Sequence, residues 1–96
     1  MDWYVYVILC SDGSLYTGIT TDLSRRYRQH AGQKGAKYFR GRQPMQLVYI
    51  EKNHDRRSAG QREAAIKKLS RQQKWQLIGS PGNSVQDFAK PEQGRY

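Results

Sequence analysis

The chain has 96 residues, 36% of them hydrophobic, and its 17 lysines and arginines outnumber eight acidic residues to give a formal net charge of +9. This length supports one domain with one modest core and excludes a second domain. A cationic surplus of this size in a small domain indicates a polyanionic partner such as a nucleic acid, although a basic surface that only maintains solubility is the alternative.

The cysteine content and the apolar segments indicate a cytoplasmic protein. Cys10 is the only cysteine, so an internal disulfide is excluded, as is typical in a reducing compartment. The apolar run at residues 3–10 is far shorter than the roughly 20 residues that a membrane span requires. It also lacks the basic leader and cleavage site of a signal peptide. We therefore expect a soluble cytoplasmic protein that has no contact with a membrane.

Two strands are predicted at the start of the chain. Residues 3–10, WYVYVILC, are apolar at both alternating sets of positions, which predicts a strand that is buried on both faces and central in its sheet. The segment SDGS then signals a hairpin turn, and residues 15–19, LYTGI, form the second strand.

The length of the hairpin loop decides which side chains share a face of the sheet. A two-residue loop would place Tyr6 and Tyr16 on opposite faces. A three-residue loop with Gly13 in the left-handed conformation places Tyr6 opposite Gly18 and on the same face as Tyr16. We predict the three-residue loop.

The first helix is predicted to begin directly after the second strand. Thr20 or Thr21 is expected to cap it, with Asp22 adding negative charge at its positive end. Leu23 and Tyr27 are four residues apart and would face the core.

Arg26 and His30, also four residues apart, lie on the adjoining edge of this helix. Gly32 and Gly35 are expected to end it. The basic loop at residues 34–42, KGAKYFRGR, follows.

The second half of the chain predicts one strand and two helices. Residues 45–52, MQLVYIEK, form the strand, and a helix begins at Asn53 or Asp55. The segment SRQQ is a capping box that begins the last helix, which stops at Gly79.

The predicted elements describe an α+β fold of order β-β-α-β-α-α, with a small three-stranded, mostly antiparallel sheet flanked by helices. The domain is expected to span residues 1–79. Residues 80–96 are rich in Pro, Gly, Ser and Gln without periodicity, so they are expected to form a flexible C-terminal tail.

Glu63 is the most informative single residue. It lies four residues after Ala59 and three before Ile66, so it shares the helix face that should pack inward. Carboxylates are rarely buried without a cation. Glu63 therefore forms a salt bridge to an arginine such as Arg26, or it holds Mg²⁺ or Mn²⁺, which prefer oxygen ligands.

Several residues with useful chemistry are predicted to meet on one face. Tyr6 and Tyr16 supply phenolic hydroxyls, Gly18 leaves open space, and Arg26 with His30 supplies a phosphate clamp and a base. With a carboxylate opposite, this set suits the hydrolysis of a phosphodiester.

These residues resemble the GIY-YIG nuclease family. The two namesake tripeptides of that family lie on neighbouring strands, and here YVY stands at residues 4–6 and YTG at residues 16–18. The family arginine follows the second tyrosine by ten positions, which is Arg26, and a His or Tyr follows four later, which is His30. The metal-binding glutamate of the family lies on a later helix, in the stretch that matches REAAIKKL, which is Glu63.

The resemblance covers residues 2–80 and is strongest to the stand-alone, single-domain bacterial members. It implies phosphodiester hydrolysis with one divalent ion, Mg²⁺ or Mn²⁺, held by Glu63. Tyr16 is then the first candidate for the general base, with Tyr6 hydrogen-bonded to it or to the attacking water. His30 is the second candidate.

Three features depart from the family pattern, one of which is an asparagine of several active relatives that has no clear counterpart here, near Trp75. Tyr4 stands where the first tripeptide has a glycine, which should affect strand packing more than chemistry. Ile19 stands where DNA-repair relatives carry a lysine, so one phosphate contact is missing.

Contacts to the nucleic acid are expected from the basic first helix, the loop that follows it and the open space at the second tripeptide. The residues are Gly18, Arg25, Arg28, Lys34, Lys37, Arg40 and Arg42. Contacts of this kind follow a backbone without reading bases. We therefore expect a preference for shape or for single strands.

Three functions are compatible with these observations. The first is a metal-dependent endonuclease that acts on structured or single-stranded DNA, with a role in DNA repair or recombination. The second is a nucleic-acid-binding adaptor with weak or lost catalysis. The third is a catalytic subunit that depends on a protein partner for substrate binding. In each case the expected ligand is DNA rather than RNA, and the oligomeric state stays open.

Overall fold

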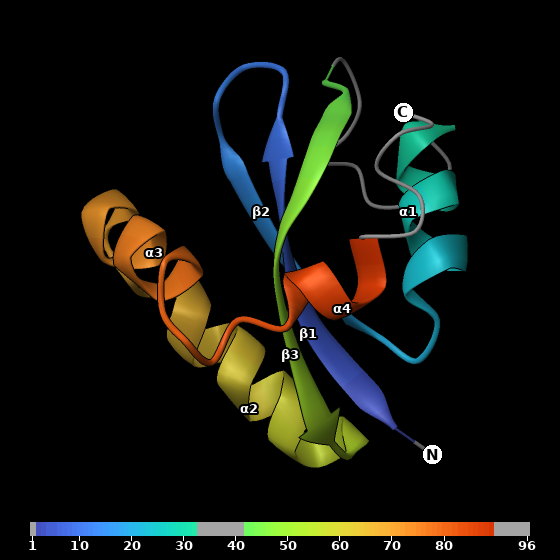
Figure 1. Cartoon of the computed structure of the whole chain (residues 1–96), viewed down its shortest axis with the longest axis vertical. Coiled ribbons are helices and arrows are strands. Elements are labelled where there is room, and N and C mark those ends of the chain that lie inside the picture. Colours follow the sequence, from blue (N-terminus) through green and yellow to red (C-terminus); the bar gives the residue numbers. More distant parts are fainter. Residues whose placement is uncertain (1, 33–41, 90–96) are drawn as a thin grey trace.

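The computed structural model describes residues 2–32 and 42–89, and Figure 1 shows a three-stranded sheet with helices on both sides. The elements are β1 Trp3–Cys10, β2 Leu15–Thr20, α1 Leu23–Ala31, β3 Pro44–His54, α2 Arg56–Lys67, α3 Arg71–Ile78 and α4 Val85–Ala89. The sheet is antiparallel with strand order β2-β1-β3. The predicted α+β fold and its order are confirmed, with α4 as an addition. Within the described residues no helix combines the length and apolarity needed to cross a membrane.

β1 is the central strand, as predicted from its apolar residues on both faces. Val5 and Val7 point to one face of the sheet, and Tyr6 and Ile8 point to the other, and all four are buried. Each face is covered by different helices, so β1 belongs to two cores at once.

The hairpin between β1 and β2 has the predicted three-residue loop. Gly13 adopts a positive φ of 85°, and the Cys10 N–H donates to the Ser14 carbonyl at 2.9 Å. The register then pairs Tyr6 with Gly18. The prediction that Tyr6 and Tyr16 point to the same face of the sheet is therefore confirmed.

Two clusters of apolar side chains hold the helices on the sheet. On one face Tyr6 and Ile8 pack against the α1 residues Leu23 and Tyr27. On the opposite face the core contains Val5, Val7, Val48, Tyr49, Ala59 and Ile66, the last two from α2. Helix α1 therefore covers the Tyr6 face, and α2 covers the other (Figure 1).

The start of α1 differs from the prediction. Asp22 is the N-cap itself, and its carboxylate accepts from the Arg25 N–H at 3.1 Å. Thr20 is still part of β2, and its hydroxyl accepts from the Asp22 N–H at 3.0 Å. The prediction of Thr20 or Thr21 as the cap is wrong, because the first backbone bond of the helix runs from the Arg26 N–H to the Asp22 carbonyl, at 3.0 Å, and Thr20 is still in the strand.

The other helix ends agree with the signals in the sequence. Asp55 is the N-cap of α2, one of the two residues proposed, and Ser70 begins α3 with the predicted capping box. Gly32 follows α1 and Gly79 follows α3 as their C-caps. The second stop signal predicted for α1, Gly35, lies outside the described residues.

Residues 80–89 pack on the sheet instead of forming a tail. The Asn83 side chain donates to the carbonyls of Val48 and Ile78, both at 2.8 Å, and accepts from the Ile50 N–H at 3.1 Å. α4 then places Phe88 edge-on against Tyr4, with ring centroids 5.3 Å apart. The flexible tail was therefore predicted to start too early, and residues 90–96 lie outside the described residues.

His30 is a buried polar residue in the core between α1 and the sheet. Its side chain has no exposed surface, and its Nε2 lies 2.9 Å from the Tyr6 hydroxyl. Burial, followed by the positive charge of Arg26, lowers the pKa of His30 to about 4. The imidazole is therefore neutral at pH 7.

Replacing Asn83 tests whether residues 80–89 belong to the folded unit. We expect Asn83→Ala to lower the free energy of unfolding by about 2–3 kcal/mol, since it removes several partly buried hydrogen bonds and leaves β3 backbone groups unsatisfied. Urea unfolding followed by circular dichroism measures the change. Ser84→Ala is the matched control, because it keeps the backbone bond from the Ser84 N–H to the Ile50 carbonyl. Equal stability of both variants and the wild type would contradict the packing of this segment.

The pKa of His30 predicts how stability varies with pH. As the pH falls below 6.5, His30 binds a proton in the unfolded chain but not in the folded one until the pH approaches 4. This group alone should cost about 2 kcal/mol of stability between pH 7 and pH 5. Urea unfolding at both pH values should show a smaller loss in His30→Gln, which does not titrate. The same loss in variant and wild type would refute a depressed pKa at His30.

Candidate active site

Four side chains predicted to meet do lie together, on the α1 face of the sheet. They are Tyr6 from β1, Tyr16 from β2, and Arg26 and His30 from α1. The Tyr16 ring meets the His30 ring edge-on with centroids 5.2 Å apart, and the Tyr6 centroid lies 6.3 Å from Tyr16 and 6.0 Å from His30. The hairpin register and the four-residue spacing on α1 therefore produce one compact cluster.

Gly18 makes room for Tyr6. A Cβ atom at Gly18 would collide with the Tyr6 hydroxyl and lie 2.6 Å from its Cζ. Gly18 is itself buried beneath the tyrosine ring. It therefore allows Tyr6 to extend across β2, and the prediction that Gly18 faces a nucleic acid is wrong because Tyr6 fills that space.

The Tyr6 hydroxyl is held in its protonated form. Burial is the main cause that raises its pKa, and the neighbouring Tyr16 and Glu63 raise it further, while hydrogen bonding to Arg26 and the charge of Arg26 oppose the shift. A neutral phenol beside a neutral imidazole can donate its proton to Nε2 of His30. Tyr6 therefore acts as a hydrogen-bond donor and not as a base at pH 7.

Arg26 joins this buried cluster to an open hollow on the surface. It is half-buried, and its Nη1 donates to Oε1 of Gln29 at 3.0 Å. The hollow has a volume of about 300 Å³ and lies between the end of β2 and the start of α1, with Arg25 and Thr21 also in its wall. The guanidinium can therefore contact a ligand in the hollow while it stays beside the phenols.

Glu63 belongs to α2, which covers the face of the sheet opposite the cluster. α2 packs against the edge strand β2, and Tyr6 extends over that same strand at Gly18. The Glu63 charge contributes a small part of the rise in the pKa of Tyr6. Its side chain keeps 24% of its surface exposed and forms an ion pair with Lys67, Nζ to Oε2, at 3.2 Å.

This ion pair tests the first of the two interpretations of Glu63, a salt bridge to an arginine. The expected salt bridge to Arg26 is wrong, because the recorded partner is Lys67 on the next turn of the same helix. Within the described residues no group of three or more His, Cys, Asp or Glu side chains could hold a metal. A single accessible carboxylate still suits Mg²⁺, which retains several waters and uses substrate phosphate to complete its shell.

The basic residues predicted to contact nucleic acid divide into three groups. Arg25 and Arg28 are exposed on α1 and available to a ligand. Arg42 forms an ion pair with Asp12 in the hairpin loop, so part of its charge is neutralised within the protein. The remaining three lie outside the described residues: Lys34, Lys37 and Arg40.

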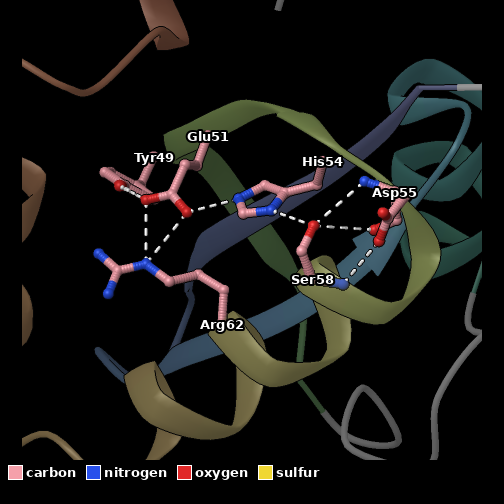
Figure 2. A network of polar contacts seen from close by, with 6 residues as sticks. All are labelled: Tyr49, Glu51, His54, Asp55, Ser58 and Arg62. Carbon is pink, nitrogen blue, oxygen red and sulfur yellow. Dashed lines mark hydrogen bonds and ion pairs between the residues drawn. The ribbon is translucent and has the colours of Figure 1, made fainter.

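A polar network that the sequence reasoning missed fixes α2 against β3 (Figure 2). Glu51 accepts from the Tyr49 hydroxyl at 2.6 Å and from Nε of Arg62 at 3.0 Å to both carboxylate oxygens. Nε2 of His54 lies 2.7 Å from the same carboxylate, and Nδ1 of His54 lies 2.8 Å from the Ser58 hydroxyl.

This network adds to the packing of Ala59 and Ile66, which turns one face of α2 to the sheet. Arg62 directly precedes Glu63, so the two side chains leave the helix in different directions. Burial and the bond to Glu51 raise the pKa of Tyr49 to about 12, so this phenol stays a donor. The spacing could have revealed the contact, since Tyr49 and Glu51 share one face of their strand.

Comparison with known proteins finds a family model and relatives that cover most of the chain. The model of the GIY-YIG catalytic domain matches residues 2–76. The UPF0213 protein CPE1444 of Clostridium perfringens is 48% identical over 87 residues, which are 91% of this chain and 94% of that protein. The UPF0213 protein HQ_3675A of Haloquadratum walsbyi is 54% identical over 74 residues, which are 77% of this chain and 83% of that protein.

Two solved structures share the fold. The solution NMR structure of the UPF0213 protein BH0048 from Bacillus halodurans is 44% identical, with a TM-score of 0.56 over 94% of this chain and 96% of that one. The solution NMR structure of the protein EF2693 from E. faecalis is 42% identical, with a TM-score of 0.56 over 80% of this chain and 83% of that one. The family expected from the two tripeptides is confirmed, and the chain belongs to the GIY-YIG family, within its UPF0213 group of single-domain proteins.

Proposed function

We propose that this protein is a metal-dependent endonuclease that hydrolyses phosphodiester bonds in structured or single-stranded DNA. The observation that supports the proposal most is the cluster of two phenols, a guanidinium and an imidazole on the α1 face of the sheet, together with the accessible carboxylate on α2. These are Tyr6, Tyr16, Arg26, His30 and Glu63. The family of the chain is the second support.

Glu63 is the residue that would hold the cation. One Mg²⁺ or Mn²⁺ bound there would polarise the scissile phosphate and stabilise the charge on the leaving oxygen. Lys67 now pairs with this carboxylate, and more than half of its side-chain surface is exposed. Lys67 can therefore exchange Glu63 for a phosphate of the substrate.

Arg26 is proposed to bind the phosphoryl oxygens. A guanidinium presents a planar fork of donors that matches two oxygens of one phosphate. Arg26 lies at the wall of the surface hollow, beside the phenols. It can therefore neutralise charge that develops on the phosphate during attack.

Tyr16 is proposed as the general base that takes the proton of the attacking water. His30 is less suited to this role because it is fully buried and its Nε2 is already bonded to Tyr6. Its pKa of about 4 also makes it a weak base. His30 and Tyr6 therefore position Tyr16, whose ring lies edge-on against the imidazole.

A nucleic-acid-binding adaptor with little or no catalysis is the second candidate. Ile19 favours it, because an apolar residue lies in the wall of the hollow where DNA-repair relatives have a lysine. The ion pair between Glu63 and Lys67 also favours it, since the protein itself already neutralises this carboxylate. An adaptor would keep its affinity for nucleic acid without a divalent metal.

The role of Glu63 can be tested by measuring cleavage. With Mg²⁺ or Mn²⁺ present, we expect cleavage of single-stranded, duplex or branched DNA to fall at least about 100-fold in Glu63→Gln, because the amide removes the negative charge that holds the cation. Asp87→Asn is the matched control, since Asp87 forms an exposed ion pair with Lys52 and contacts no residue of the cluster, so cleavage should stay unchanged. A structured RNA tests the expected preference for DNA.

Three results of this assay would contradict the endonuclease. Equal cleavage by the wild type and Glu63→Gln would identify a contaminating nuclease. Cleavage that persists in EDTA would exclude the metal. No cleavage, together with binding that weakens with salt, would support the adaptor.

The identity of the base can be tested by pH–rate profiles of two variants. We expect Tyr16→Phe to lower kcat by about 100-fold or more, because general-base catalysis typically contributes that much. His30→Gln should lower kcat less and keep the shape of the profile, since His30 only positions Tyr16. A loss of only a few-fold in Tyr16→Phe, with a profile that changes shape in His30→Gln, would reverse the assignment.

A further inference from the structure

Most of the net positive charge of this protein lies on one helical segment that the proposed mechanism scarcely uses. Residues 56–79 contain seven cations and one acidic residue, a net charge of +6 out of the +9 of the whole chain. The cations are Arg56, Arg57, Arg62, Lys67, Lys68, Arg71 and Lys74. Arg62 and Lys67 pair with Glu51 and Glu63, respectively.

The C-terminal half of this segment combines three of the five remaining cations, Lys68, Arg71 and Lys74, with an exposed aromatic ring. Trp75 on α3 retains 38% of its surface exposed, although a tryptophan is normally largely buried. The Arg71 guanidinium lies 5.9 Å from the centroid of its ring, one helical turn earlier. Lys68 and Lys74 lie on the same segment, before and within α3.

The core makes little use of this helix. α3 has no fully buried residue, and Leu77 and Ile78 at its end are the residues of α3 that pack against the core. Trp75 therefore lies on a polar, basic surface and is not part of the hydrophobic core. Ser70 with Gln73 caps the start of α3, and Gly79 caps its end. The exposed side chains of α3, and not its ends, are therefore available to a ligand.

We propose that α3 is a binding site for single-stranded nucleic acid, in which Trp75 stacks on a base and Arg71 and Lys74 contact the adjacent phosphates. An exposed indole next to a guanidinium suits a base because every base has a π-face for stacking, and the cations follow the backbone. The bases of a duplex stay stacked on each other, so a duplex can bind only to the cations of α3 through its phosphates. The ring thus favours a single strand over a duplex.

The α3 site can also serve the proposed endonuclease, because α3 lies close to Glu63 in the sequence. This part of the inference rests on the proposed function. α3 follows the C-terminal end of α2 (Figure 1), and Lys67 and Lys68 lie between Glu63 and α3. A strand whose phosphate reaches Glu63 can continue along these lysines to Trp75. The site would therefore hold the unpaired part of a substrate close to the point of cleavage.

Binding of a fluorescein-labelled oligothymidylate, followed by fluorescence anisotropy in EDTA, tests the proposal without any catalysis. We expect Trp75→Ala to weaken binding at least about 5-fold with an unchanged salt dependence, because stacking does not release counterions. Trp75→Phe should recover much of the loss. Lys74→Ala should reduce the slope of log K against log salt by about 0.7. A duplex of the same length should bind Trp75→Ala and wild type equally.

Controls separate this site from folding effects and from the active site. Met45→Ala removes another exposed apolar side chain, and Arg56→Ala removes a cation from the far end of α2, so neither should weaken binding as Trp75→Ala does. Thermal unfolding of each variant shows whether a loss of binding reflects a loss of structure. If Trp75→Ala is unstable, the two single variants Trp75→Phe and Lys74→Ala still test the proposal.

Two outcomes would overturn the proposal. Wild-type affinity in both Trp75→Ala and Lys74→Ala would remove α3 from the interface. Equal weakening of single strand and duplex by Trp75→Ala would show that no base stacks there. The test is independent of the endonuclease, since a protein that never cleaves DNA can still lose single-strand affinity in Trp75→Ala, and Glu63→Gln can abolish cleavage without any effect at α3.

Discussion

The arrangement of the candidate site depends on the buried hydrogen bond between the Tyr6 hydroxyl and Nε2 of His30. The bond forms because Gly18 has no side chain to stop Tyr6 from crossing β2. It joins the central strand to the last turn of α1, so the helix that carries Arg26 is held at one position on the sheet. A buried polar pair of this kind is stable only while both partners stay neutral, and both pKa shifts keep them so.

The sequence was sufficient to predict the contacts that depend on periodicity. Alternation along β1 and the glycine in the hairpin loop determine which face Tyr6 and Tyr16 occupy, and helical spacing places Arg26 and His30 together. The sequence could not predict that Tyr6 would fill the space at Gly18, because that depends on the path of one long side chain across a neighbouring strand.

The errors share one physical cause, which is competition between local signals and distant contacts. Three consecutive residues could have capped α1, but Thr20 stays in β2 and Asp22 makes the capping bond. Glu63 pairs with Lys67 on its own helix, while Arg26 lies on α1, which covers the opposite face of the sheet. Residues 80–89 looked like a tail because the Asn83 bonds go to backbone atoms of β3, which composition does not reveal.

The same bonds from Asn83 and Ser84 change what the sheet presents to other proteins. β3 is an outer strand, and an outer strand offers unpaired N–H and C=O groups to which a strand of a second molecule can add. Here the Ile50 N–H is bonded to Asn83, and the Ile50 carbonyl accepts from the Ser84 N–H at 2.8 Å. The middle of this outer edge is thereby closed by the chain itself, so the segment after α3 protects the sheet against self-association through β3.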